Sequence, residues 1–118
     1  MTAGTATAPA RPDPQLTPGD YGTTRQPRKV PGALKRAVYR RYGIGILRRV
    51  LYTIDHLVPL ELCGTNAITN LWPQRRREAK LKDADENRLA AELLRRQVTL
   101  AQAQAEILRL WGPSAAVP

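Results

Sequence analysis

Apolar residues recur at helical spacing after the proline-rich beginning of the chain. Between Pro31 and Tyr42 they fall on one face at intervals of four residues, as Leu34 and Val38 show. Proline suits the first turn of a helix, and Gly43 suits the position after its end. The pattern therefore predicts a helix from Pro31 to Tyr42.

Two further helices are predicted in the second half of the chain. The stretch 75–97 is helix-prone and carries leucines on one side. Thr99 is followed three residues later by Gln102, which is the pattern of a capping box and predicts a new helix start. This last helix is expected to reach Trp111 and to stop at Gly112.

Strand patterns lie between the first helix and the second. The segment Ile46–Ile54 is β-branched and aliphatic with inserted arginines, and is predicted as a strand. Val58–Leu62 either extends this strand or forms a loop, and 64–66 predict a turn. Leu71 and Trp72 predict a short second strand closed by Pro73. The expected fold class is α+β, with a small antiparallel β element and flanking helices.

The ends of the chain differ from its centre. The first 31 residues hold six of the ten prolines, with many Thr and Ala and little periodicity. Such a segment cannot bury enough apolar surface to offset its chain entropy. We predict a disordered tail over residues 1–30, one domain over 31–112 and a disordered C-terminus over 113–118. A chain of 118 residues suits one domain and not two.

Positive charge dominates the composition. The chain carries 19 Lys and Arg against 10 Asp and Glu, so its net charge is +9. Such a balance favours a polyanionic partner, either nucleic acid or an anionic membrane surface. Between Tyr21 and Ile54 there are nine Lys or Arg and no acid. We interpret this stretch as a surface that follows phosphates rather than as an ordinary solvated face. The expected nucleic-acid contacts are Arg48, Arg49, Arg75, Arg76 and Arg77.

Other features bear on location. No apolar run reaches membrane-spanning length, and no secretory signal pattern is visible at the N-terminus. The single cysteine, Cys63, allows no intrachain disulfide. We therefore expect a cytoplasmic protein without a membrane partner. The pattern predicts no particular oligomeric state.

One histidine stands beside a carboxylate at the expected strand end. His56 is the only histidine in the chain, and Asp55 precedes it. Phosphodiester hydrolysis requires a base for the attacking water and a cation that neutralises the phosphate. An imidazole suits the base, and a carboxylate oxygen suits a hard ion such as Mg²⁺. Neighbouring strand residues point to opposite faces, so the pair shares one site only where the strand ends. Alone, such a pair is more often an ordinary polar pair.

The sequence around this pair carries a resemblance. Its parts are Asp55 to Asn66 (Asp-His-Leu-Val-Pro-Leu-Glu-Leu-Cys-Gly-Thr-Asn), Asn70 to Gln74 (Asn-Leu-Trp-Pro-Gln), Lys82-Asp83 and Glu86-Asn87. These stretches resemble the HNH nucleases of the His-metal-finger (ββα-metal) superfamily. Weaker likeness upstream of Gly43 and downstream of Leu100 extends the match to about four-fifths of the chain.

The resemblance implies a metal-dependent DNA endonuclease with a small ββα-metal core and flanking helices. His56 would be the general base, and Asp55 would be a metal ligand. Asn70 would hydrogen-bond the loop backbone and so fix His56. The implied cofactor is Mg²⁺, with Mn²⁺ as an alternative, and the implied partner is DNA.

The sequence departs from the family pattern at the second metal ligand. Many such sites have an Asn or His three residues before a helical Lys. Counting back from Lys82 gives Ala79, which cannot coordinate a metal. We take Asp83 as the second ligand, with Glu78 and Glu86 as alternatives.

Two further departures concern the turn and the helix start. Cys63 stands where the pattern has Gly, and a Gly-Gly turn can need a positive φ that Cys tolerates poorly. The basic insert 75–77 replaces a longer segment of mixed composition.

Two other functions compete with the nuclease. One is a degenerate HNH module that binds nucleic acid without cutting it, which the missing ligand at Ala79 favours. The other is a small basic domain that binds a protein partner. The intact Asp55, His56 and Asn70 favour the enzyme. A zinc finger is excluded, because one Cys and one His cannot complete a closed zinc site.

Overall fold

A computed structural model describes residues 22–23 and 28–112 of the chain. The expected disorder of residues 1–30 and 113–118 falls mostly outside the described residues. Gly22, which the structure does describe, donates its backbone N–H to the Cys63 carbonyl at 2.9 Å. The guanidinium of Arg28 pairs with Glu61 at 3.3 Å. These parts of the 1–30 segment therefore lie against the domain.

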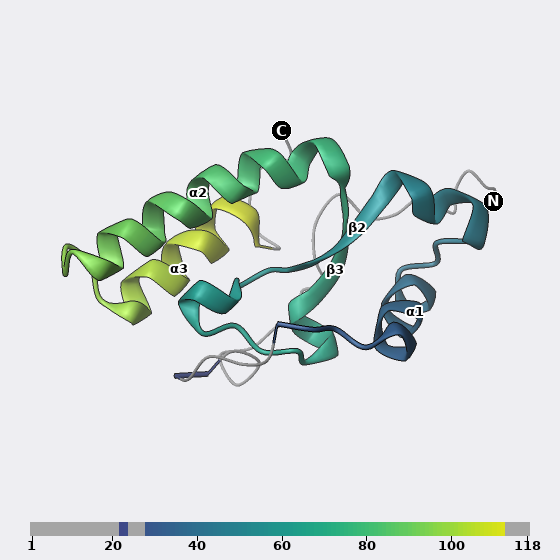
Figure 1. The fold of residues 1–118 in the computed structure, drawn as a ribbon, viewed down its shortest axis with the longest axis horizontal. Helices are drawn as coiled ribbons and strands as arrows, with labels where there is room; N and C mark the ends of the chain where they lie inside the picture. Colours follow the sequence, from purple (N-terminus) through teal and green to yellow (C-terminus); the bar gives the residue numbers. More distant parts are fainter. Residues whose placement is uncertain (1–21, 24–27, 113–118) are drawn as a thin grey trace.

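Two antiparallel strands form the centre of an α+β domain, as the sequence predicts (Figure 1). Strand β2 (Tyr52–His56) pairs with β3 (Leu71–Arg75), and His56 lies opposite Leu71. Three short 3₁₀ turns, η2 (Ile46–Leu51), η3 (Leu60–Leu62) and η4 (Ile68–Asn70), lie before and between the strands.

In the described part of the chain, three α-helices flank the strands. Helix α1 (Gly32–Arg41) packs on β3 at one end of the molecule. Helices α2 (Arg76–Leu94) and α3 (Leu100–Trp111) run side by side at the other end, and α2 also contacts both strands (Figure 1). None of the described helices is long and apolar enough to cross a membrane.

The predicted helix signals act as expected. Gly43, just after α1, has a φ of +71°, which suits a glycine after a helix end. The capping box is present, because Thr99 Oγ1 accepts from Gln102 N at 3.1 Å and Gln102 Oε1 accepts from Thr99 N at 2.8 Å. Helix α2 ends at Leu94, before the predicted residue 97, and Arg96 takes a φ of +58°.

The strand predicted over Ile46–Ile54 is wrong in its first two-thirds, which form η2 instead. The partner strand β3 has only five residues, and it pairs only with Tyr52–His56. A strand without a partner leaves its backbone groups unbonded, so the preceding residues turn into a 3₁₀ helix.

Pro73 does not close the second strand, as the sequence suggested, but lies within β3 opposite Ile54. In a two-stranded sheet each strand is an edge, so a residue without an N–H can face away from its partner. The strand therefore continues to Arg75, where α2 begins.

The core lies beside the end of β2. Leu57, Val58 and Leu62 follow His56 in the chain, and they pack with residues of the two long helices. The buried cluster comprises Leu57, Val58, Leu62, Trp72, Leu89, Ala103, Ile107 and Trp111. These buried residues anchor the start of the loop that follows β2.

The loop after η3 makes a close backbone approach. A Cβ on Gly64 would lie 1.6 Å from the Val58 carbonyl oxygen, so only glycine fits there. The preceding residue, Cys63, has a φ of +63° and a ψ of +31°, the left-handed conformation that the Gly pattern anticipated. A side chain in this conformation is strained.

We expect the variant Cys63→Gly to raise the free energy of unfolding by roughly 0.5–1 kcal/mol. Glycine removes the steric cost of the left-handed conformation but loses more chain entropy on folding. Urea denaturation measures the change. Cys63→Ala is the control, because alanine keeps the Cβ and should give no gain. An equal gain from both variants would contradict strain at this position.

Candidate active site

The loop that follows His56 is closed by one buried amide. Asn70 has no exposed surface; its Oδ1 accepts from Val58 N at 3.0 Å. Its Nδ2 donates to the carbonyls of Val58, at 3.1 Å, and Thr65, at 2.9 Å. Its own carbonyl accepts from Leu57 N at 2.8 Å. Asn70 thus bonds the loop backbone at its start and near its middle. The resemblance implies such a contact between Asn70 and the loop backbone.

The imidazole of His56 is held through its Nε2 atom. Nε2 lies 2.7 Å from Asn66 Oδ1, and Asn66 Nδ2 donates to the Lys29 carbonyl at 3.2 Å. A carbonyl accepts only, so the amide nitrogen of Asn66 must face Lys29 and its oxygen must face His56. Nε2 then carries the proton, and Nδ1 of a neutral ring keeps its lone pair.

The sequence reasoning gave Asn66 no role. The only signal was its place at the end of the block that resembles HNH nucleases. Its bond to His56 depends on the fold of the loop, which brings together two residues ten positions apart.

A buried lysine lies behind the strand end. Lys82 on α2 is 1% exposed, and its Nζ donates to the His56 carbonyl at 2.7 Å. The same ammonium forms an ion pair with Asp55 Oδ2 at 2.9 Å, although without hydrogen-bond geometry, and it bonds Glu86 Oε2 closely. One cation therefore faces two carboxylates and the backbone of the catalytic candidate.

The candidate second metal ligands are placed differently along α2. Asp83 is exposed, because the residue after Lys82 projects about 100° further round the helix. Glu86, one turn beyond Lys82, is 7% exposed and shares the ammonium with Asp55. Of the carboxylates considered, the structure thus brings Glu86 rather than Asp83 beside Asp55. Glu78 is partly exposed in the first turn of α2.

Burial changes the ionisation of this cluster. It raises the pKa of Glu86 from 4.5 to about 7, and the Asp55 charge adds to the effect, while Lys82 opposes it. Within the described part of the chain, no three His, Cys, Asp or Glu side chains gather as a metal-binding group.

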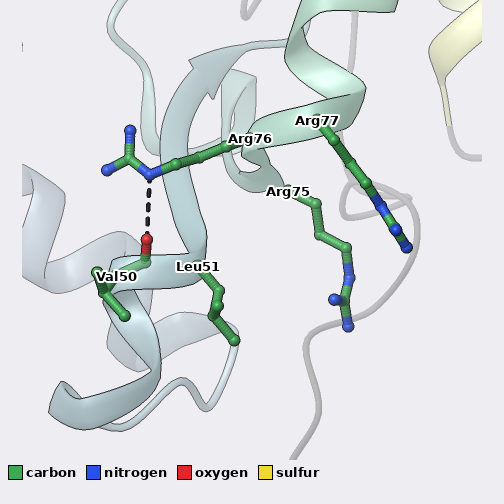
Figure 2. A pocket seen from close by; sticks show the side chains of 5 residues that line it. All are labelled: Val50, Leu51, Arg75, Arg76 and Arg77. Carbon is green, nitrogen blue, oxygen red and sulfur yellow. Dashed lines mark hydrogen bonds between the residues drawn. The ribbon is translucent and has the colours of Figure 1, made fainter.

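The predicted arginine contacts fall into two sets. Arg75, Arg76 and Arg77 are exposed at the start of α2 and line a surface pocket together with Val50 and Leu51 (Figure 2). Arg76 turns towards η2, where its Nε donates to the Val50 carbonyl at 3.0 Å, whereas Arg75 and Arg77 point away from it (Figure 2).

The second set, Arg48 and Arg49, is half-buried in η2. Arg49 donates to the Ile44 carbonyl at 3.3 Å, and its guanidinium lies 4.9 Å from the centroid of the Tyr39 ring. These contacts hold the turn against α1 and leave less of each side chain for a partner.

Comparison with protein-family models, with curated proteins and with solved structures finds no match to this chain.

We expect the variant Lys82→Met to lower the free energy of unfolding by about 3 kcal/mol, because it leaves the buried carboxylate of Glu86 and the partly buried carboxylate of Asp55 without a cation. Urea denaturation measures this. Lys80→Met is the matched control, since Lys80 is exposed on the same helix and its loss should cost less than about 0.5 kcal/mol. Equal losses from the two variants would contradict the role of Lys82.

The raised pKa of Glu86 predicts a pH dependence of stability. Between pH 4.5 and about 7 the unfolded chain loses this proton and the folded chain keeps it. The stabilisation is therefore complete below pH 4.5 and is lost as the pH rises through about 7. Glu86→Gln should remove this dependence, so the variant should gain stability relative to the wild type between about pH 5 and about pH 8. Urea denaturation of both proteins across this pH range, with a chelator present, tests this. A difference in the free energy of unfolding that does not change with pH would refute it.

Proposed function

We propose that this chain is a metal-dependent HNH-type endonuclease that hydrolyses DNA phosphodiester bonds, with His56 as the general base. The observation that carries the proposal is the orientation of the His56 ring. Asn66 accepts the Nε2 proton, so the lone pair of Nδ1 is available to an attacking water.

The residues around His56 support this role. Water attacks phosphorus as Nδ1 takes its proton, a new P–O bond forms, and the bond to the leaving oxygen breaks. The Asn66 oxygen stabilises the positive charge that develops on the ring. Asn70 keeps the loop in place, so the base needs little reorganisation when the substrate arrives.

The chemistry of the donor set fits a hard divalent cation. Asp55 would hold the ion through carboxylate oxygen, and Mg²⁺ is often bound by one or two carboxylates plus substrate phosphate. Mn²⁺ is the alternative. When bound, the ion supplies Lewis-acid stabilisation of the phosphate charge. Asp55 already shares its Oδ2 with Lys82, so affinity for the ion is expected to be modest.

The arginines support DNA as the substrate. Arg75, Arg76 and Arg77 are exposed in a row next to β3, and the acid-free stretch 21–54 adds to the positive charge of the chain. Contacts of this kind bind phosphates without reading the base sequence, and they weaken with salt.

A second candidate function is a nucleic-acid-binding module that does not cut. Two observations favour it. The ammonium of Lys82 already neutralises Asp55, and Ala79 lacks the donor that many HNH sites have at that position.

The variant His56→Ala should lose DNA cleavage by a factor of ~10²–10⁴, because no other imidazole exists to accept the proton. Plasmid nicking with Mg²⁺ or Mn²⁺, with and without chelator, measures the activity. DNA binding should stay nearly unchanged, since affinity comes from dispersed arginines, and circular dichroism controls for folding.

Two results would count against the proposal. Cleavage by His56→Ala at the wild-type rate would assign the activity to another site or to a contaminant. A wild type that binds DNA but cuts with neither metal would establish the binding module instead.

A further inference from the structure

The turn η2 exposes an unusual amount of apolar surface. Four of the six large apolar side chains that the described residues expose lie in this one segment. They are Ile46 at 79%, Leu47 at 91%, Val50 at 71% and Leu51 at 50%. The other two, Leu81 and Leu94, stand singly on α2. A concentrated apolar prominence of this kind marks an interaction site more often than a scattered residue does.

The prominence is held in place by its backbone. Arg49 donates to the Ile44 carbonyl before the turn, and Ile44 itself is 3% exposed. Arg76 donates to the Val50 carbonyl near its other end. The apolar side chains therefore project from a fixed support.

Positive charge lies beside one part of the prominence. Val50 and Leu51 share a surface pocket with Arg75, Arg76 and Arg77 (Figure 2). The stretch from Tyr21 to Ile54, which includes η2, holds no acid. A partner that complements this surface must combine dense negative charge with exposed apolar faces. Duplex DNA offers both where a base step is opened, since phosphates then flank two unstacked base faces.

We propose that Ile46 and Leu47 form an apolar wedge that inserts between base pairs of duplex DNA from the minor groove. Arg75, Arg76 and Arg77 bind the phosphates beside it. This inference rests on the proposed function for its choice of DNA. Aliphatic side chains unstack a base step and kink the duplex, and the bend brings more of the DNA against the protein.

The prominence lies close to His56 along the chain. Leu51, the last residue of η2, precedes His56 by five positions, and β2 runs directly from η2 to His56.

The test compares DNA binding by the wild type with that by the double variant Ile46→Ser, Leu47→Ser. Fluorescence anisotropy with a labelled duplex at several salt concentrations gives affinity and its salt slope. We expect roughly tenfold weaker binding by the variant with an unchanged slope, because the slope counts neutralised phosphates. Replacing Arg75, Arg76 and Arg77 by Ala should instead lower the slope.

A second readout reports base unstacking directly. A duplex containing 2-aminopurine should brighten when the wild type binds and should brighten less with the double variant at saturation. Leu94→Ser is the matched control, because Leu94 is 85% exposed at the far end of α2. It should behave as the wild type in both measurements.

The outcomes separate this inference from the proposed function. Equal affinity and equal 2-aminopurine response in wild type and double variant would overturn the wedge and leave the nuclease standing. Binding with unstacking but without cleavage would support the wedge and refute the nuclease. A wild type that does not bind duplex DNA would overturn both. A double variant that binds DNA as the wild type does, but no longer binds anionic phospholipid vesicles or no longer dimerises, would assign the prominence to a membrane surface or to a second copy of the chain. Either result would overturn the wedge.

Discussion

The buried amide of Asn70 bonds the loop that connects the two strands, at Val58 near its start and at Thr65 near its middle. With no surface exposed, its donors and acceptor must be satisfied inside the protein, and Val58 and Thr65 supply the partners. This bonding sets where β2 stops. It therefore also determines where His56 lies and which residues of the loop, Asn66 above all, reach the imidazole ring.

The cluster around Lys82 imposes a second constraint. Its ammonium compensates Asp55 and Glu86 at a place where water is largely excluded. The same compensation weakens the attraction of Asp55 for a second cation. The stability that Lys82 provides and the affinity of Asp55 for a divalent ion thus oppose each other, and substrate phosphate would have to supply some of the ligands of the ion.

Local signals predicted the local parts of the fold. The capping box at Thr99 and the glycine after α1 need only neighbouring residues to act, and both predictions are confirmed. Whether Ile46–Leu51 forms a strand depends on the length of β3, which lies 20 residues away, so that prediction failed. Similarly, the choice between Asp83 and Glu86 depends on how α2 is rotated against β2. The Asp-His pair and Asn70 could be proposed from the sequence because the pattern that carries them lies within residues 55–74.

The tautomer of His56 tests the central claim most directly, since the ring is the only imidazole in the chain. Nitrogen-detected NMR of the ¹⁵N-labelled protein, with the ring in its neutral form, distinguishes the two ring nitrogens. The account predicts a protonated Nε2 and an unprotonated Nδ1, with this preference lost in Asn66→Ala. A proton on Nδ1 in the wild type would contradict the account, because the lone pair would then be held by Asn66 and no base would face the water.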